Sequence, residues 1–430
     1  MIDFSISPEF EGVLDWVREF VRERVEPMDA YFDYDHTLPY NRHDALSRSV
    51  LKPLQRIVKD KGLWGIHLPP HLGGPGITTV ELALVNFVLG RTRWGPVTFG
   101  AQAPDSGNGE ILANFGTPEQ KRRWLEPLWA GDCYSCFSMT EVEGGSDPTQ
   151  FVTSAVLEGD EWVINGEKWY SSNAHLADFL IVVCRTEPDA ERVHDRFSTI
   201  IVPQGTPGLE IVRQVGLASD PYGAPGHPHL RFEDCRIPAE AILGPRGGGF
   251  KVAQARLGGG RIHHAMRAVG QAEKMLEMMT ERAVSRVTKG KPLAHHQLVQ
   301  MDVAECWMEI EQLKLLVLRT AWLLDQRRDE EARLWIGACK VRCSEVLRNV
   351  SRKAMHLMGS LGMSNMTPLK NEQLSAEILG MADGPSEVHQ MQVGRAILKT
   401  GRQSPGRFPS FYLPTLKAQA AEKLGLPLRA

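Results

Sequence analysis

The residues best placed for proton chemistry in this 430-residue chain lie near the end of a long helical region. In the stretch GMADGPSEVHQ, residues 380–390, Asp383 is followed directly by Gly384 and Pro385. A carboxylate fixed at a corner of the backbone can act as a general base. Asp-Gly-Pro is also an ordinary turn signal, and from these residues alone we interpret the segment as a turn with an incidental acid.

Two further segments carry groups that suit a flat or phosphorylated cofactor. The stretch CFSMTEVEGGSDPT, residues 136–149, leaves an expected strand for a loop whose backbone N–H groups and hydroxyls could bind phosphate. In GEKWYSSN, residues 166–173, strand alternation predicts that Trp169 and Tyr170 point to opposite faces, with Ser172 on the face of Tyr170. The alternatives, an ordinary loop and a half-exposed aromatic residue, stay open.

The stretch RLGGGRIHHA, residues 256–265, places Arg261 at the start of an expected long helix. A cation there opposes the helix dipole, and this mismatch favours a functional role for Arg261 over a solvated one. Cys133 and Cys136 form a C-x-x-C pair, but no second pair and no neighbouring His cluster completes a zinc site. We therefore expect these two cysteines to be structural and the chain to bind no metal.

Composition and charge exclude several classes of protein. The chain has 49 basic and 52 acidic residues, and they are interspersed, so no basic face for nucleic acid is expected. The N-terminal MIDFSISPEF lacks the features of a secretory signal or a transit peptide. The aliphatic run FLIVVC, residues 179–184, is too short to span a bilayer. We therefore expect a cytoplasmic protein without a membrane span.

The elements that position these residues change in texture along the chain. Helical periodicity dominates residues 1–133, short β-branched and aromatic stretches follow over 134–242, and long helical patterns occupy 243–404. Helices expected near 296–326, 331–359 and 371–382 join the helix of Arg261 in a four-helix bundle. Asn165-Gly166 predicts a hairpin in the middle region. The expected fold class is α+β, with an N-terminal helical domain, a middle β-barrel-like domain, a C-terminal bundle and a tail over 405–430.

These motifs together resemble the acyl-CoA dehydrogenases over residues 8–400. The resemblance is carried by SMTEVEGGSD, INGEKWYSSN, GGGFKVAQARLGGGRI and ADGP. It is most similar to the branch that has Asp in ADGP where most members have Glu followed by Gly-Thr, and APDSGNGEIL, residues 103–112, also matches that branch. The resemblance implies the acyl-CoA dehydrogenase fold, non-covalently bound FAD, and a homodimer or homotetramer.

The resemblance also implies a reaction and its partners. Asp383 would remove the α proton of an acyl-CoA thioester while the β hydrogen leaves as hydride to flavin N5, giving trans-2-enoyl-CoA. The backbone N–H of Asp383 would help to hold the thioester oxygen. An electron-transfer flavoprotein or a similar acceptor would reoxidise the flavin. An acyl-CoA oxidase and a non-catalytic flavoprotein of the same fold are the alternatives.

The family's site residues carry over by motif. For FAD they are Phe137, Met139, Thr140, Gly145, Ser146, Tyr170, Ser172, Gly384 and Glu387, with Arg286, His356 and Ser360 reaching a partner's FAD across a dimer. For the substrate they are Ser146, Arg261, Gly384, Asp105 and Asn108. Polar groups at Asp105 and Asn108 predict a short, polar or branched acyl group, unless they face a neighbouring loop instead. Lys289, His356 and Ser360 depart from the family's usual aromatic, Gln and Gly, which puts the contacts to adenine in doubt.

Overall fold

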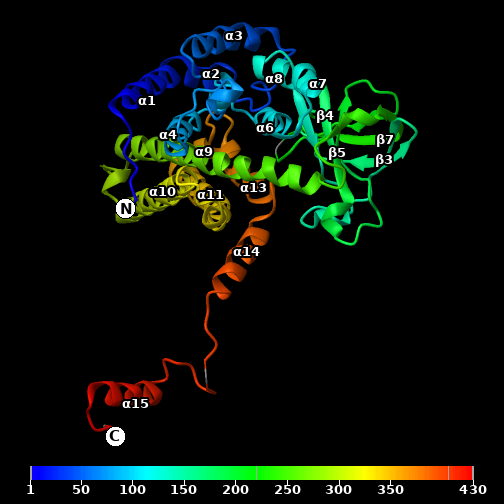
Figure 1. Cartoon of the computed structure of the whole chain (residues 1–430). Helices are drawn as coiled ribbons and strands as arrows, with labels where there is room; N and C mark the ends of the chain where they lie inside the picture. Colours follow the sequence, from blue (N-terminus) through cyan, green and yellow to red (C-terminus); the bar gives the residue numbers. More distant parts are fainter. Residues whose placement is uncertain (1, 219, 405, 429–430) are drawn as a thin grey trace.

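The computed structural model describes residues 2–218, 220–404 and 406–428, and its elements form a helical region, a sheet and a bundle in that order (Figure 1). Ser7 caps the first helix by accepting from the backbone N–H of Phe10, with Pro8 at the first helical position. The helices of this region are α1 Pro8–Phe20, α2 Glu26–Tyr31, α3 Ala45–Asp60, α4 Thr79–Leu89, α5 Trp94–Thr98, α6 Asp105–Phe115, α7 Pro118–Gln120 and α8 Glu126–Ala130.

A mixed sheet follows, with strand order β6-β7-β3-β2-β4-β5-β8, and β1 pairs with β4 in parallel. Its strands are β1 Ser135–Ser138, β2 Ser154–Glu158, β3 Glu161–Lys168, β4 Phe179–Arg185, β5 Phe197–Pro203, β6 Leu209–Arg213, β7 His229–Pro238 and β8 Ile242–Leu243. The sequence FLIVVC forms most of β4, in which only Arg185 is not buried. Such a continuous apolar run is expected for a strand covered on both faces.

The hairpin predicted at Asn165-Gly166 is wrong. The tight turn lies between β2 and β3, where Glu158 pairs with Glu161. Asn165 and Gly166 lie inside β3, at an irregularity in its pairing with β7. Gly166 has a φ of 144°, and a Cβ there would lie 2.7 Å from Thr153 Cα. Glycine is therefore required at position 166 because two backbone segments approach each other closely, and not because the chain turns there.

Four long helices make the bundle, and their bounds lie close to those predicted. They are α9 Gly249–Ser285, α10 Gln297–Asp325, α11 Asp329–Met358 and α13 Leu369–Met381. Buried side chains of α4 and α9, such as Leu89 and Val269, share one hydrophobic core, so the N-terminal helices pack on the bundle. Figure 1 shows α9 running from the bundle to the sheet. The expected three-part fold is thus confirmed.

The position of Arg261 within α9 contradicts the reason given above for its importance. The helix begins at Gly249 and continues through Gly258, Gly259 and Gly260, so Arg261 lies well inside it. The dipole of a helix N-terminus therefore does not act on this side chain, and the reason given for its importance was wrong. Glycine inside a helix costs about 0.5–1 kcal/mol relative to Ala. Three in succession call for an explanation at this point of the fold.

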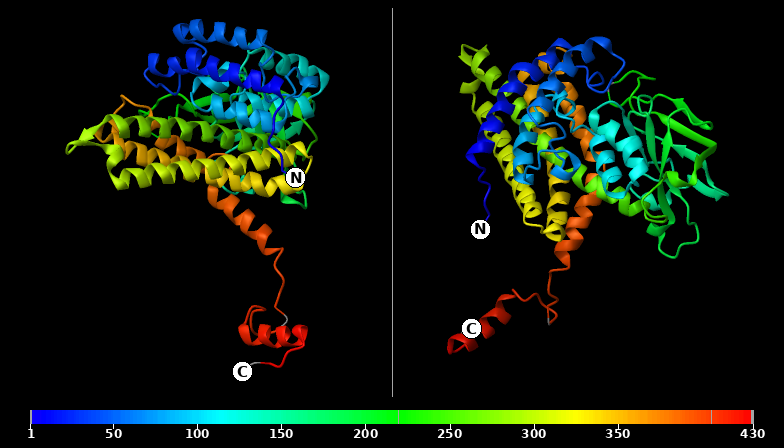
Figure 2. Two further views of the ribbon diagram at one scale, coloured as in Figure 1. Left: turned by 90° about the vertical axis from the view of Figure 1, so that its left-hand side faces the viewer. Right: turned by 45° about the horizontal axis from the view of Figure 1, so that its top comes forward.

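The remaining elements lie at the ends of the bundle. A small hairpin, β9 Val287–Thr288 and β10 Lys291–Pro292, joins α9 to α10, and α12 Ser360–Met363 follows α11. The helices α14 Ser386–Leu398 and α15 Leu413–Leu424 lead away from the body of the chain (Figures 1 and 2). Among the described residues, no helix is both long and apolar enough to cross a membrane.

Candidate active site

Asp383 lies in the loop between α13 and α14, as the turn signal predicts. Its φ is 56°, and that of Gly384 is 99°, so two successive residues adopt the left-handed region. The carbonyl oxygen of Asp383 accepts hydrogen bonds from Arg261 Nε at 3.0 Å and from His389 Nε2 at 3.3 Å. One donor belongs to α9 and the other to α14, so two helices fix this backbone corner.

The carboxylate of Asp383 faces the glycine segment of α9. A Cβ on Gly260 would lie 3.8 Å from Asp383 Oδ2, and a Cβ on Gly258 would meet no atom within 4 Å. These glycines therefore leave bare backbone on the face of α9 beside the acid. His264 Nε2 lies 3.5 Å from Asp383 Oδ2, and burial lowers the pKa of His264 to about 4. The imidazole is therefore uncharged at neutral pH.

A second group of candidate residues gathers where β1 and β3 end. Phe137 belongs to β1, and Met139 and Thr140 follow it directly. The carbonyl of Thr140 accepts from the backbone N–H of Trp169, the residue after β3, at 3.1 Å. The loop in residues 136–149, which we expected to bind phosphate, and the aromatic pair at 169–170 are thus neighbours. In the sequence the β2–β3 hairpin separates them.

The predicted opposition of Trp169 and Tyr170 is wrong. Their ring centroids lie 5.1 Å apart with an interplanar angle of 38°. The strand ends at Lys168, and Tyr170 has a φ of 54°, so strand alternation no longer applies to these two residues. Tyr170 stays 48% exposed, and Ser172 Oγ lies 2.8 Å from His227 Nδ1.

A buried ion pair that the sequence analysis missed fixes this region. Lys168 Nζ lies 2.6 Å from Glu141 Oε1 and donates to the carbonyl of Met139 at 2.7 Å. Glu141 also accepts from the backbone N–H groups of Val152 and Thr153. Both charged side chains have no exposed area. The pair therefore ties the loop after β1 to the end of β3, and no local signal distinguished these two residues from other charges.

The segment that contains Gly145 and Ser146 is open, as a ligand loop must be. Both residues are exposed, and a Cβ on Gly145 would meet no atom within 4 Å. Together with Phe137, Thr140 and Tyr170, this open loop provides aromatic rings, hydroxyls and backbone groups where β1 and β3 end. The donor set fits a flat ring system with an attached phosphate.

Arg256 connects the two groups of residues. Its guanidinium lies 4.3 Å from the ring centroid of Phe137, and its Nε donates to Asn108 Oδ1 at 2.8 Å. Burial lowers the pKa of Arg256, and the charge of Asp383 acts in the opposite direction. Since Arg256 and Arg261 lie on the same stretch of α9, this helix brings Phe137 and Asp383 to one place.

The side chains of Asp105 and Asn108 are buried and form hydrogen bonds to other residues of the chain. Asp105 Oδ1 accepts from the N–H and hydroxyl of Ser135 at 2.8 and 2.7 Å, and Asn108 Nδ2 donates to Ser135 Oγ at 2.9 Å. Burial raises the pKa of Asp105 to about 6. This geometry favours the alternative in which the two residues face a neighbouring segment, and their role in binding substrate stays a prediction.

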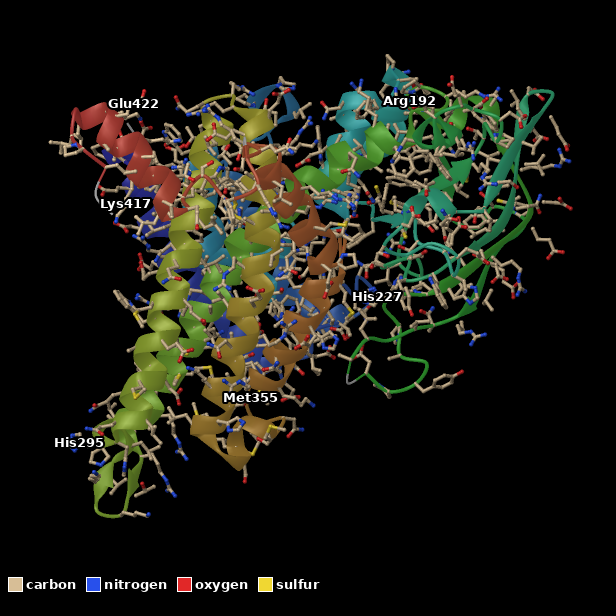
Figure 3. All side chains as sticks on the ribbon, turned by 90° about the horizontal axis from the view of Figure 1, so that it is seen from below. Arg192, His227, His295, Met355, Lys417 and Glu422 are labelled. Atoms are coloured by element: carbon tan, nitrogen blue, oxygen red, sulfur yellow. The ribbon has the colours of Figure 1, made fainter. Side chains whose placement is uncertain are left out.

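The residues expected to act across a dimer lie elsewhere. Arg286, His356 and Ser360 are exposed, and so is Glu387 in the first turn of α14. Arg286 precedes the β9–β10 hairpin, and Figures 1 and 3 show this end of the bundle, marked by His295, on the side away from the sheet. Within one chain these residues do not meet the group around Phe137.

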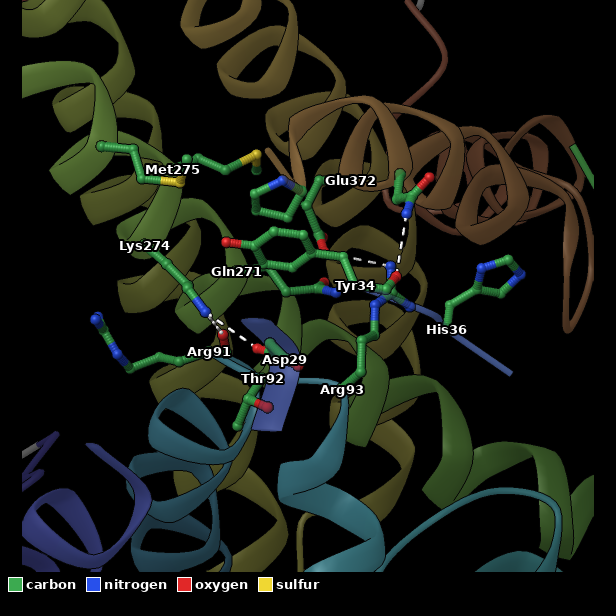
Figure 4. A pocket seen from close by; sticks show the side chains of 14 residues that line it. Asp29, Tyr34, His36, Arg91, Thr92, Arg93, Gln271, Lys274, Met275 and Glu372 are labelled. Carbon is green, nitrogen blue, oxygen red and sulfur yellow. Dashed lines mark hydrogen bonds and ion pairs between the residues drawn. The ribbon is translucent and has the colours of Figure 1, made fainter. Parts of the chain in front are cut away.

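The cavity shown in Figure 4 is separate from all these residues. It lies between the N-terminal helices, α9 and α13. Opposite charges inside it pair with one another: Lys274 with Asp29 at 3.2 Å, and Arg93 with Glu372 at 3.4 Å. None of the candidate catalytic or cofactor residues lines it, so we assign the chemistry to the surroundings of Asp383 instead.

Comparison with known proteins gives one family for all three parts of the chain. Residues 7–132, 136–235 and 247–398 match the families described as the acyl-CoA dehydrogenase N-terminal, middle and C-terminal domains. "Probable acyl-CoA dehydrogenase FadE2" of Mycobacterium tuberculosis is 37% identical over 403 residues, which cover 92% of this chain and 97% of that protein.

Longer relatives contain the same region. Acyl-CoA dehydrogenase family member 11 of Gallus gallus is 36% identical over 399 residues, and the match covers 91% of this chain but 51% of that protein. For family member 10 of Mus musculus the match covers only 37% of the relative. The chain thus spans about half or less of the length of these two vertebrate relatives.

Solved structures with a similar fold belong to the same family as the sequence relatives. A chain from Mycobacterium abscessus that carries the acyl-CoA dehydrogenase name has a TM-score of 0.85 and 36% identity, and the match covers 92% of this chain and 99% of that one. Butyryl-CoA dehydrogenase from Megasphaera elsdenii has a TM-score of 0.76 and 26% identity, with 92% and 100% covered. In sequence, in fold and in all three of its parts, this chain belongs to the acyl-CoA dehydrogenase family.

Proposed function

We propose that this protein is an FAD-dependent acyl-CoA dehydrogenase in which Asp383 is the base that removes the α proton. The observation that supports this most directly is the position of the acid. Its carboxylate lies beside the side-chain-free surface of Gly258 and Gly260, while its backbone is held by donors from two helices. A base must be fixed against an open surface on which a substrate can lie.

The residues around Asp383 have defined tasks in this proposal. Arg261 holds the carbonyl of Asp383 and so keeps the acid at its corner. The neutral ring of His264 adds no charge that would lower the basicity of the carboxylate. The backbone N–H of Asp383 helps to bind the thioester oxygen, on which negative charge develops as the proton leaves. The product is the trans-2-enoyl thioester.

The loop after β1 and the end of β3 fit FAD by their chemistry. Phe137, Met139, Thr140, Tyr170 and Ser172 would hold the flavin ring, and Gly145 and Ser146 the pyrophosphate. FAD, when bound, supplies the acceptor for the electron pair and the β hydrogen. An electron-transfer flavoprotein or a similar acceptor would then take up the electrons.

The chain would act as a homodimer or a homotetramer. Arg286 precedes the β9–β10 hairpin that leads to His295, and His356 and Ser360 follow Met355. Figure 3 shows His295 and Met355 on the side of the bundle away from the sheet, so we place these three residues at the cofactor of a partner chain. A second copy would bring this end of the bundle to the FAD of its partner. The substituted residues Lys289, His356 and Ser360 would weaken the contacts to adenine more than those to the flavin ring.

One experiment tests the assignment of both base and cofactor. The purified protein is loaded with FAD, its visible spectrum is recorded, and a panel of acyl-CoA thioesters is added without oxygen. We expect at least one thioester to bleach the flavin, and Asp383→Asn to keep the flavin band but to bleach it at least ~10³-fold more slowly. Glu119→Gln, which changes an exposed carboxylate on α7, is the matched control and keeps the rate. An unchanged rate in Asp383→Asn would remove it as the base.

A further inference from the structure

Three lysines are buried in the part of the chain that the structure describes, and one of them lacks an acidic partner there. Lys168 pairs with Glu141, and Lys353 pairs with two acids of α10. Lys340, on α11, has no exposed area, and among the described residues no carboxylate forms an ion pair with it. A buried charge without a counterion is costly, so we expect this lysine to have a specific role.

The ammonium group of Lys340 reaches the end of the helix that precedes Asp383. Its Nζ donates a hydrogen bond to the carbonyl of Leu379, in the last turn of α13. The last carbonyl groups of a helix have no partner inside it and carry partial negative charge, so a cation is favourable there. Asp383 follows Leu379 by four residues. Lys340 therefore holds the point at which the loop of Asp383 begins.

The helix α11 packs against both α13 and α14, and the face that carries Lys340 also contacts the start of α14. Ser344 lies one turn after Lys340, and its hydroxyl oxygen is 3.4 Å from that of Ser386. Ser386 is the first residue of α14 and donates to the carbonyl of Gly380 at 3.2 Å. Both ends of the Asp383 loop are thus tied to α11, a third helix beside α9 and α14.

The charge of Lys340 acts on the groups that surround Asp383. Burial lowers the pKa of Lys340, and the thiol of Cys343 and the charge of Asp383 act in the opposite direction. Burial also lowers the pKa of His264 and His389, the two histidines that contact Asp383, and the charge of Lys340 adds to this effect. Both rings are therefore uncharged at neutral pH, while Lys340 contributes positive charge from the side of α11.

We propose that Lys340 is a positioning residue for Asp383, which holds the end of α13 and whose charge favours the ionised form of this acid. Only the ionised acid can accept a proton. This inference rests on the proposed function and adds a residue to it. The lack of an ion pair among the described residues agrees with this role, because a carboxylate beside Lys340 would cancel the charge that acts on Asp383.

The test is the pH profile of flavin bleaching. The FAD-loaded protein is mixed without oxygen, from about pH 5 to pH 9, with a saturating amount of the thioester that bleaches the wild type fastest. Lys340→Met should lower the plateau rate at least ~10-fold. It should also raise the pH of the half-maximal rate by roughly 0.5–1 unit, since loss of the cation favours the protonated acid. Lys340→Gln is neutral but can still donate to Leu379, so it should raise this midpoint equally and keep more of the plateau rate.

Other charged groups face Asp383 and have to be separated from it. From α9 and α14 they are Arg256, Arg261, His264 and His389. The arginines stay charged, and the pKa of His264, about 4, lies below the range. Glu110 of α6 faces the neighbouring Gly259, and burial raises its pKa to about 7. The profiles are therefore also recorded in Glu110→Gln and His389→Gln proteins, where Lys340→Gln should shift the midpoint as before.

Lys353→Met is the matched control, because Lys353 is also buried on α11 but pairs with acids of α10. It should lower the melting temperature and leave the midpoint in place. The inference is overturned if Lys340→Gln leaves the midpoint in place, if Lys340→Met keeps the full plateau rate, or if Lys353→Met moves the midpoint as far. Each of these results would defeat this inference alone. Failure of every thioester to bleach the wild-type flavin, or an unchanged rate in Asp383→Asn, would defeat the proposed function with it.

Discussion

Replacing Lys168 by Met is expected to destabilise the region that holds the loop after β1. The substitution keeps most of the side chain's length but removes the ammonium group that contacts Glu141 and the carbonyl of Met139. Glu141 then stays buried as a carboxylate, and among the described residues its remaining partners are the N–H groups of Val152 and Thr153. A buried charge without its counterion is strongly unfavourable.

The magnitude follows from the burial of the pair. Removing one partner of a fully buried ion pair costs about 3–5 kcal/mol, and both side chains here have no exposed area. The entropy of unfolding is about 2.1 cal/mol/K per residue, so in a 430-residue chain that unfolds as one unit each kcal/mol lowers the melting temperature by roughly 1 °C. A loss of about 3–5 °C is therefore expected. Lys168→Met with Glu141→Gln should recover part of this loss, because Gln is neutral yet still accepts from the backbone.

The assay is thermal unfolding followed by tryptophan fluorescence, with flavin release recorded in the same scan. Arg122→Met is the matched control, since its pair with Glu119 is 62% and 71% exposed and contributes about 0–1 kcal/mol. A Lys168→Met protein as stable as the Arg122→Met protein would refute the reasoning. So would a double variant that is less stable than Lys168→Met alone.

Three further predictions concern the candidate site. Gly384→Ala should lower kcat by at least ~10-fold. The φ of Gly384 is 99° and a Cβ there would lie 3.0 Å from His389 Nε2, so the neighbouring base Asp383 must shift. Steady-state kinetics at constant FAD occupancy tests this prediction. Arg261→Met removes the 3.0 Å donor to the carbonyl of Asp383 and should slow flavin bleaching by roughly 10-fold, whereas an unchanged rate would show that His389 alone fixes the corner. Burial raises the pKa of Glu110 from 4.5 to about 7, so the folded state binds this proton more tightly and stability falls as pH rises across that range. Glu110→Gln should match the wild type near pH 5 and exceed its free energy of unfolding by about 2–3 kcal/mol near pH 8, as urea titrations at both pH values would show.

Local patterns in the sequence were enough for the order of the elements. Ser7 with Pro8 starts a helix because a hydroxyl cap and a proline act on their own first turn. The four helices of the bundle follow from apolar periodicity within each segment. The turn at Asp383 follows from three adjacent residues. The motifs around these elements also indicated the family, which the comparisons confirm.

The same local rules failed where a distant segment decides the outcome. Asn165-Gly166 has the pattern of a hairpin turn, but Gly166 is needed because the backbone of Thr153 approaches it closely. Gly258 to Gly260 were taken to precede a helix, but they lie inside α9, where Gly259 faces Glu110 and Gly260 faces Asp383. In both places a contact across the fold outweighs a preference worth about 1 kcal/mol.

By itself the sequence determined which segments are helices and strands, where Asp383 turns, and which family motifs are present, because these depend on residues close together in the chain. Only the tertiary structure decided three pairings. Lys168 forms an ion pair with Glu141, Ser135 donates a hydrogen bond to Asp105, and His67 lies beside Glu110 at a distance too long for a hydrogen bond. Each of these pairs joins residues more than twenty positions apart. Their partners are set by how helices and sheet dock, and docking is governed by the burial of whole faces rather than by any local pattern.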